Sequence, residues 1–318
     1  MRGHHGRTWH GVIGILAGAA AFFLTVVGII YFKDPYGRAG IRPSFQVPNV
    51  GERELLVSRA MDPQFNSAIV GSSTSIPLQP EILDPLTGRR FVSLAISGSG
   101  PQVALAVSRF FLAAHSQASS IIVALDDAWC WDGTEGRPFP SWLWGDKVDY
   151  AMGLFANASW DLFRTAVFQE RGGNRLDGFH PYDDVFRLRD FDDMDFLLKR
   201  LNRTQRPTQA RFMPPFAPPK WLFELIDRHP SVQFVLFWTP RYISIIPVAG
   251  TSAAEADGAC KRQVADSAAA RANAVVVDWS MDRAENRDPT NFFDPNHYRD
   301  SVARQAERDI ASAYQNLK

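Results

Sequence analysis

The chain has 318 residues, of which 46% are hydrophobic and 21% are charged, an ordinary composition for one or two globular domains. Its 34 basic and 34 acidic residues give a formal net charge of zero. We therefore expect no nucleic-acid partner, because nucleic-acid binding calls for a clustered basic excess.

Residues 11–32 read GVIGILAGAAAFFLTVVGIIYF, an uncharged run in which only Thr25 is clearly polar. At ~1.5 Å per residue this run spans about 33 Å, which is enough to cross a bilayer. A cleaved signal peptide is the main alternative, but its apolar region is about 7–15 residues long and ends in a small-x-small site. The run lacks such a site, so we favour a retained transmembrane helix behind a tail at residues 1–10. Basic residues flank both ends, so the positive-inside rule does not decide the orientation.

Prolines and glycines interrupt residues 33–65 repeatedly, which predicts a stalk with one short helix at 52–60. The soluble domain is predicted over residues 66–318. Within it, residues 131–218 are rich in tryptophan, aspartate, arginine and proline, and we expect a mostly helical insertion. The tryptophans would form local core or, alternatively, a sugar-stacking surface or lid.

Short apolar runs alternate with helical segments along the rest of the domain. Strands are expected at residues 67–70, 91–96, 120–125, 232–238 and 274–278. Helices are expected at residues 80–83, 101–114, 221–228, 253–272 and 298–316. Near-continuous apolar strands alternating with helices indicate a parallel sheet covered on both faces. The predicted fold is therefore a three-layer α/β/α sandwich with about five parallel strands, similar to flavodoxin.

Two motifs at opposite ends of the domain carry candidate chemistry. The first expected strand runs into Gly71-Ser72-Ser73, and Asp294-Pro295-Asn296-His297 stands near the C-terminus. Serine is a poor nucleophile unless an imidazole accepts its proton, and the imidazole needs a carboxylate that fixes its tautomer. Structural alternatives exist for both motifs, because serines cap helices and Asp-Pro-Asn sequences form turns.

The order of these motifs resembles the SGNH (GDSL-like) hydrolase superfamily. With the N-terminal anchor, the chain is most similar to the envelope branch containing D-alanyl-lipoteichoic acid and alginate O-acetylation proteins. The resemblance implies that Ser73, rather than Ser72 or Ser75, is the nucleophile. It also implies that His297 is the general base and Asp294 its orienting acid.

The resemblance further implies an oxyanion hole made by the backbone amides of Ser73 and Gly98. Gly98-Ser99-Gly100 could alternatively be a dinucleotide-binding loop, but that fingerprint needs a glycine where Val103 stands. We therefore reject the dinucleotide site, and the expected serine chemistry requires neither an organic cofactor nor a metal.

The third block departs from the family pattern, because Asp126-Asp127 stands where Asn-Asp is expected. An asparagine would donate to the oxyanion, whereas an ionised Asp126 would repel it. Trp129 and Trp131 follow this block and could border the pocket. Arg241 could reach an anionic substrate, although a surface salt bridge is the interpretation we favour.

The resemblance implies a membrane-anchored serine acyl-ester hydrolase or O-acyltransferase whose domain lies on the extracytoplasmic (periplasmic) side. Its substrate would be an acylated envelope carbohydrate, and a multi-spanning membrane acyltransferase is a candidate partner besides the lipid bilayer. The alternative is a catalytically degenerate scaffold that binds polysaccharide or such an acyltransferase. In that compartment Cys130 and Cys260 could form a disulfide, and two separate buried thiols fit the sequence equally well.

Overall fold

The computed structural model describes residues 5–34, 36–38, 52–130, 139–157, 193–203, 205–212 and 214–317. The chain divides into two compact units. Unit 1 comprises Met1–Ser58 and Pro140–Arg175, and unit 2 comprises Arg59–Phe139 and Leu176–Lys318.

Unit 2 contains a five-stranded sheet in the order β2-β1-β3-β4-β5, with every neighbouring pair parallel. The strands are β1 (Ser67–Gly71), β2 (Phe91–Ala95), β3 (Ser120–Leu125), β4 (Gln233–Trp238) and β5 (Ala274–Asp278). The predicted α/β class and parallel sheet are therefore confirmed.

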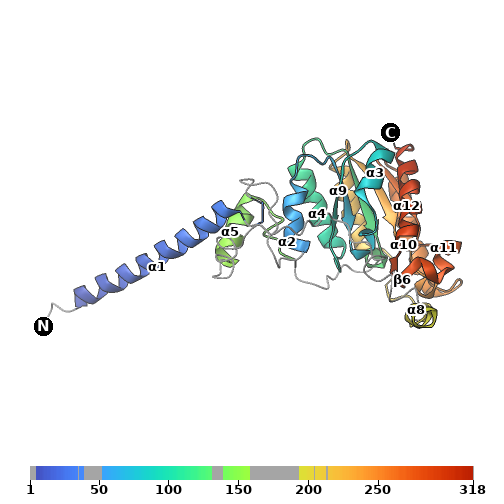
Figure 1. The fold of residues 1–318 in the computed structure, drawn as a ribbon, viewed down its shortest axis with the longest axis horizontal. Helices are drawn as coiled ribbons and strands as arrows, with labels where there is room; N and C mark the ends of the chain where they lie inside the picture. Colours follow the sequence, from blue (N-terminus) through green and yellow to red (C-terminus); the bar gives the residue numbers. More distant parts are fainter. Residues whose placement is uncertain are drawn as a thin grey trace. The chain divides into compact units, whose positions relative to one another are not determined.

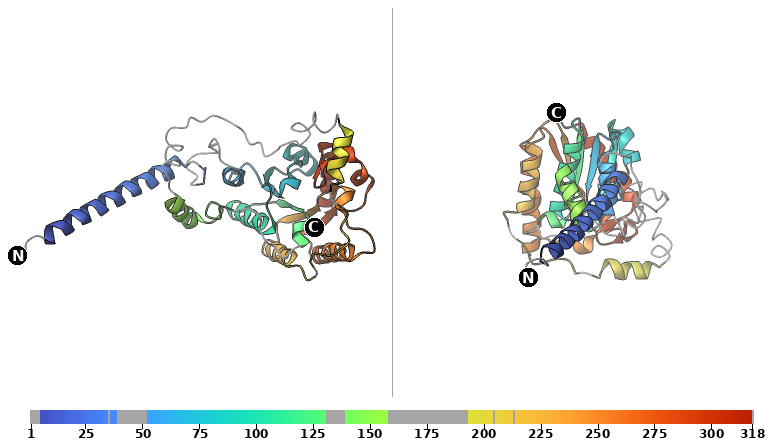
Figure 2. Two further views of the ribbon diagram at one scale, coloured as in Figure 1. Left: turned by 90° about the horizontal axis from the view of Figure 1, so that it is seen from below. Right: turned by 90° about the vertical axis from the view of Figure 1, so that its left-hand side faces the viewer.

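Helices cover both faces of this sheet, as Figure 1 and Figure 2 show. On one face, α12 (Asp300–Tyr314) contacts α3 (Pro80–Thr87), β4 and β5. On the other face, α4 (Pro101–Ala114) contacts β1, and α10 (Ser252–Ala269) contacts β5, with α9 (Ala217–Asp227) between them. Because both faces are covered, every residue of β1, β2 and β3 is buried, and this explains their continuous apolar sequences.

The strand order reverses at β1, which lies between β2 and β3. In the register, Ile69 pairs with Ser93 of β2 on one side and with Ile122 of β3 on the other. The segments that follow β1 and β3 diverge at such a point, and open α/β sheets bind ligands in the crevice this creates. Ser73 follows β1 and Asp126 follows β3, so both lie at this crevice.

A small antiparallel hairpin, β6 (Phe292–Asp294) and β7 (His297–Tyr298), precedes the last helix. The sequence predicts the closing helix from residue 298, but α12 begins at Asp300. Tyr298 pairs with Phe292 in the hairpin instead, and both side chains are fully buried.

Unit 1 contains α1 (His5–Lys33) and α5 (Lys147–Asn157), while α2 (Glu52–Ala60) crosses the division between the units. Within α1, the stretch His10–Lys33 is long and apolar enough to cross a membrane, as either an anchor or a signal sequence. In the expected insertion at 131–218, the described helices are α5, α8 (Met194–Leu201) and the start of α9.

Candidate active site

A close-packed turn carries the candidate nucleophile out of β1. A Cβ atom added to Gly71 would lie 2.7 Å from Cβ of Ala124 and 2.8 Å from Oγ of Ser75, so only glycine fits here. The chain then enters a 3₁₀ turn over Ser73–Ser75. The glycine is therefore required by the close approach of β3 to the end of β1.

The two serines of this turn have different roles in the structure. Ser72 caps the turn, because its Oγ accepts a hydrogen bond from the Thr74 N–H at 3.4 Å. Oγ of Ser73 lies instead 2.8 Å from Nε2 of His297, 224 positions along the chain. The capping role thus falls on Ser72 and leaves the Ser73 hydroxyl in contact with the imidazole.

The carboxylate of Asp294 completes a chain of three side chains. Nδ1 of His297 lies 2.7 Å from Oδ2 and 2.8 Å from Oδ1 of Asp294. The same Oδ1 accepts the N–H groups of Asn296 and His297 at 2.9 and 3.0 Å. Asp294 therefore forms the turn that the motif predicts and also orients the imidazole. The His297 and Asp294 side chains remain 23% and 21% exposed, so a substrate can reach them.

Several contacts hold the pKa of Asp294 below its usual range. Partial burial alone would raise this pKa, but the hydrogen bond and charge of His297, with the N–H bonds of Asn296 and His297, outweigh it. Nη2 of Arg200 lies 3.9 Å from Oδ2. The acid is therefore ionised and suited to stabilise an imidazolium.

Polar contacts from α12 fix the segment that follows the Ser73 turn. Arg304 donates to the Pro77 carbonyl at 2.6 Å, and Glu307 accepts the Gln79 N–H at 2.6 Å. Nη2 of Arg304 also lies 2.8 Å from Oε1 of Glu307. Because α12 directly follows the hairpin with His297, these contacts tie the two halves of the candidate site together.

Gly98 lies in a loop bound to the end of β1. It has φ +65°, in the left-handed region that favours glycine. The loop is held by Ile96 N–H and Ser99 Oγ, which donate to the Gly71 carbonyl at 3.0 and 3.2 Å. Within the described part of the chain, the Gly98 N–H has no acceptor. It is therefore available as a donor, as the expected oxyanion hole requires.

Asp126 is turned towards Ser72. Its Oδ2 accepts the Ser72 hydroxyl at 2.8 Å, and its Oδ1 accepts the Ala128 N–H at 3.1 Å. Burial raises the pKa of Asp126 to about 6, the charge of Asp127 adds to this, and the two hydrogen bonds oppose it. Burial also raises the pKa of Asp127, against the charge of Arg241.

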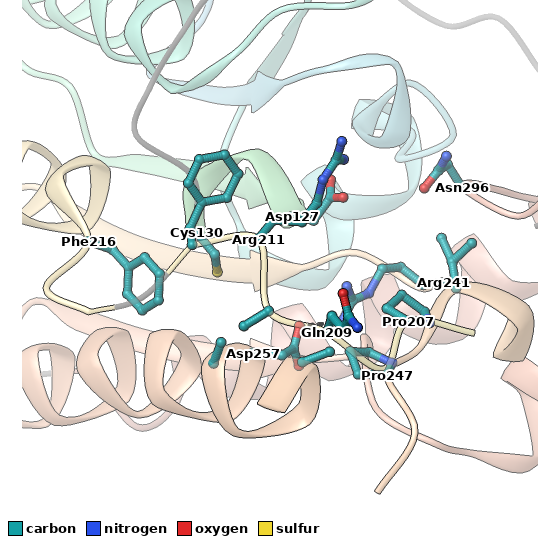
Figure 3. Close-up of a pocket in the computed structure, with 15 residues that line it drawn as sticks. Asp127, Cys130, Pro207, Gln209, Arg211, Phe216, Arg241, Pro247, Asp257 and Asn296 are labelled. Atoms are coloured by element: carbon teal, nitrogen blue, oxygen red, sulfur yellow. Dashed lines mark hydrogen bonds and ion pairs between the residues drawn. The ribbon is translucent and has the colours of Figure 1, made fainter. Parts of the chain in front are cut away.

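A cavity of about 340 Å³ lies beyond the ends of β3 and β4. Figure 3 shows Cys130 and Phe216 at one end of it and Asn296, the neighbour of His297, at the other. The lining residues include Asp127, Cys130, Gln209, Arg211, Phe212, Phe216, Arg241, Asp257 and Asn296. Of the five predicted pocket residues, which also include Asp126, Trp129 and Trp131, Asp127 and Arg241 belong to this lining and Asp126 does not. Trp129 is buried and is not part of this lining, and Trp131 lies outside the described residues.

The predicted surface salt bridge of Arg241 is instead a buried one. Arg241 is only 7% exposed, and its Nη2 donates to Oδ1 of Asp257 at 2.9 Å and to the Ser280 carbonyl at 3.3 Å. Asp257 belongs to α10, which packs against β5, and its side chain is 22% exposed where the pair lines the cavity. The paired guanidinium is therefore a fixed part of the cavity wall.

Cys130 and Cys260 form a disulfide, with their Cα atoms 5.7 Å apart. This resolves the two alternatives that the sequence left open. The bond attaches the 3₁₀ turn Asp127–Cys130, directly after Asp126, to α10. At this wall of the cavity, the segment that follows β3 is thus covalently linked to α10.

Sequence reasoning missed Asp257, Glu307 and Ser72 as parts of the site. A signal for Glu307 exists, because it lies four positions after Ala303 on the buried face of α12. The roles of Ser72 and Asp257 depend on side-chain directions, which residue spacing does not specify.

The assignment of a function to this chain depends on the geometry of the site, because two comparisons with known proteins give no match. A scan against models of protein families finds no match for the chain, and a search of curated proteins finds none either.

Proposed function

We propose that the chain is a membrane-anchored serine acyl-ester hydrolase or O-acyltransferase of the SGNH type. One observation carries the proposal: the hydrogen-bonded series from Ser73 through His297 to Asp294. A hydroxyl, an imidazole and an ionised carboxylate in this order form the arrangement that activates serine for acyl transfer.

In the first step, Oγ of Ser73 attacks the acyl carbonyl while Nε2 of His297 takes the hydroxyl proton. The C–O bond to the leaving alkoxide then breaks, and His297 returns that proton to the alkoxide. Asp294 stabilises the imidazolium between these events. The amides of Ser73 and Gly98 would bind the tetrahedral oxyanion.

The second step decides between hydrolysis and transfer. His297 deprotonates either water or a sugar hydroxyl, whose oxygen attacks the acyl-Ser73 carbonyl and releases the serine. Water gives a free acid, and a sugar hydroxyl gives a new ester. We propose acyl groups on an envelope carbohydrate as the substrate class, because the motif order and the N-terminal apolar helix together resemble that branch of the superfamily.

We further propose that α1 is a retained anchor and that unit 2 lies outside the cytoplasm. The Cys130–Cys260 disulfide supports this side of the membrane, because disulfides persist mainly in oxidising compartments.

A degenerate scaffold is the second candidate, and Asp126 is the observation that favours it. One assay separates the candidates: the full chain is incubated with p-nitrophenyl acetate, with and without an oligosaccharide, and acetate and acetylated sugar are measured by mass spectrometry. We expect the unaltered chain to form one of these products faster than buffer alone, and Ser73→Ala to form neither above the buffer rate. A folded chain that does not exceed the buffer rate for either product would support the scaffold.

A further inference from the structure

Helix α5 of unit 1 exposes an apolar stripe. Val148, Met152 and Phe155 are 68%, 63% and 47% exposed. They lie at positions i, i+4 and i+7, and therefore on one face of the helix. The opposite face, with Tyr150 and Leu154, is buried. A helix with apolar side chains on both faces is unusual in water.

The contacts of α5 with α1 show which environment this stripe meets. The rings of Phe155 and Phe23 lie 4.9 Å apart, edge to face, and the rings of Tyr150 and Tyr31 lie 6.1 Å apart. The two helices contact each other, and the ring contacts follow opposite order along them, since Phe155 meets the earlier residue of α1 and Tyr150 the later one. Phe23 precedes Lys33 by ten residues, which is about 15 Å along a helix and half of a hydrocarbon layer.

The charged residues of α5 are distributed as expected for a helix whose second half lies inside a bilayer. Its charged residues, Lys147 and Asp149, stand in the first turn, beside the end of α1. Residues 150–156 read YAMGLFA and contain no charge. The uncharged part of α5 is therefore the part that accompanies the interior of α1.

Aromatic side chains gather where α1 ends. The rings of Tyr36 and Trp142 lie 5.7 Å apart, and the rings of Trp142 and Tyr150 stack at 6.0 Å. Arg38 donates to the carbonyls of Leu143 and Gly145 beside this group. Tyrosine and tryptophan concentrate at membrane–water interfaces, so these rings mark the boundary of the hydrocarbon layer.

We propose that α5 enters the bilayer beside α1, with Val148, Met152 and Phe155 facing lipid tails. The partner of this surface is the lipid bilayer, and the continuity of the stripe with the apolar surface of α1 argues for it. The inference rests on the proposed retention of α1 as an anchor. In the described part of unit 1, α1 would then be accompanied in the membrane by α5 rather than cross it alone.

Nitroxide spin labels on the full chain test this depth. The protein is reconstituted in phosphatidylcholine–phosphatidylglycerol vesicles with the label at Met152→Cys, Leu24→Cys or Met281→Cys. The two native cysteines are bonded to each other and do not react. Collision rates with oxygen, which enriches in lipid, and with a nickel chelate, which stays in water, are measured by electron paramagnetic resonance.

We expect the oxygen-to-nickel ratio at M152C to match that at L24C in α1 and to exceed severalfold that at M281C, an exposed site of unit 2. A lipid-like ratio at L24C with a water-like ratio at M152C would overturn the inference and leave the anchor intact. Water-like ratios at both would overturn the anchor as well. Low collision with both reagents at M152C would mean that protein covers the stripe, and would also overturn the inference. F155C repeats the test at the deeper end of α5.

Discussion

Two aspartates flank the same pair of serines, and their surroundings shift their pKa values in opposite directions. Asp294 reaches Ser73 through His297 and accepts N–H bonds that keep its pKa low. Asp126 contacts Ser72, and burial beside a second acid raises its pKa to about 6. Near neutral pH, one acid is firmly ionised while the other is close to its titration midpoint.

The supports of the two sides also differ. Hydrogen bonds from Arg304 and Glu307 of α12 hold the Ser73–His297 side of the site, whereas a disulfide holds the Asp126 side. The first side has the geometry of proton transfer, and the second forms a cavity wall. In the sequence, an aspartate at position 126, where the family pattern has asparagine, argued against catalysis. The comparison shows that this side chain is bonded to Ser72 rather than to the candidate nucleophile.

The largest expected effect comes from breaking the Ser73 side. His297→Gln removes the base, and Asp294→Asn leaves the imidazole in the wrong tautomer, so each should lower the turnover of p-nitrophenyl acetate by about 10⁴-fold. Steady-state kinetics measures the loss. His229→Gln, at the opposite end of β4, is the control and should keep full turnover. Loss of less than tenfold in H297Q would contradict the proposed base.

Removing the disulfide tests the covalent support of the Asp126 side. A Cys130→Ser/Cys260→Ser variant loses a link between residues 130 positions apart, and we expect its free energy of unfolding to fall by about 2–4 kcal/mol. Denaturation followed by tryptophan fluorescence measures this. Reductant should destabilise the unaltered chain equally and leave the variant unchanged. If reductant has no effect on the unaltered chain, the covalent support is absent.

Glu307 allows a pH-dependent test of the contacts between α12 and the segment that follows Ser73. It is fully buried, its Oε2 has no hydrogen-bond partner within the described chain, and burial raises its pKa to about 8. From its ordinary 4.5 up to about 8, the folded chain retains a proton that the unfolded chain releases. The free energy of unfolding therefore falls as pH rises through this window.

Glu307→Gln removes that proton exchange. Relative to the unaltered chain, we expect its free energy of unfolding to rise by about 3 kcal/mol between pH 5 and pH 8. Denaturation curves at the two pH values measure this, with the exposed Glu255→Gln as control. Identical pH dependence in E307Q and the unaltered chain would contradict the buried-acid account.

The smallest effect is expected at Asp126. Asp126→Asn removes a negative charge from the side chain that bonds Ser72, the neighbour of the candidate nucleophile, so ester turnover at pH 8 should rise about tenfold, and the gain should shrink at pH 5, where Asp126 is protonated. Asp127→Asn removes the neighbouring charge without a bond to Ser72 and should give a smaller gain. An equal ratio at both pH values would show that the charge of Asp126 does not act on the reaction.

Much of the fold was predictable from the sequence because its strands are buried on both faces. The runs at 120–125 and 274–278 coincide with β3 and β5, and Pro101 begins α4 as expected at a first helical turn. The β6–β7 hairpin was not predicted, since its strands are very short and its turn sequence also suits a helix start.

The site was predictable only where a motif fixes direction. Gly71 and the Asp-x-x-His spacing sufficed to bring Ser73, His297 and Asp294 together as candidates. The bond from Ser72 to Asp126 depends on a side-chain rotamer, and the burial of Arg241 depends on where α10 lies. Such contacts arise from tertiary packing and leave no pattern in the local sequence.

A fluorophosphonate probe tests the central claim most directly, because it forms a stable adduct only with an activated serine. After incubation of the full chain, intact-mass and peptide mass spectrometry locate the adduct. The account predicts a single adduct on Ser73, its loss in Ser73→Ala, and its retention in Ser72→Ala. A folded chain without an adduct, or one modified at Ser72 instead, would contradict it.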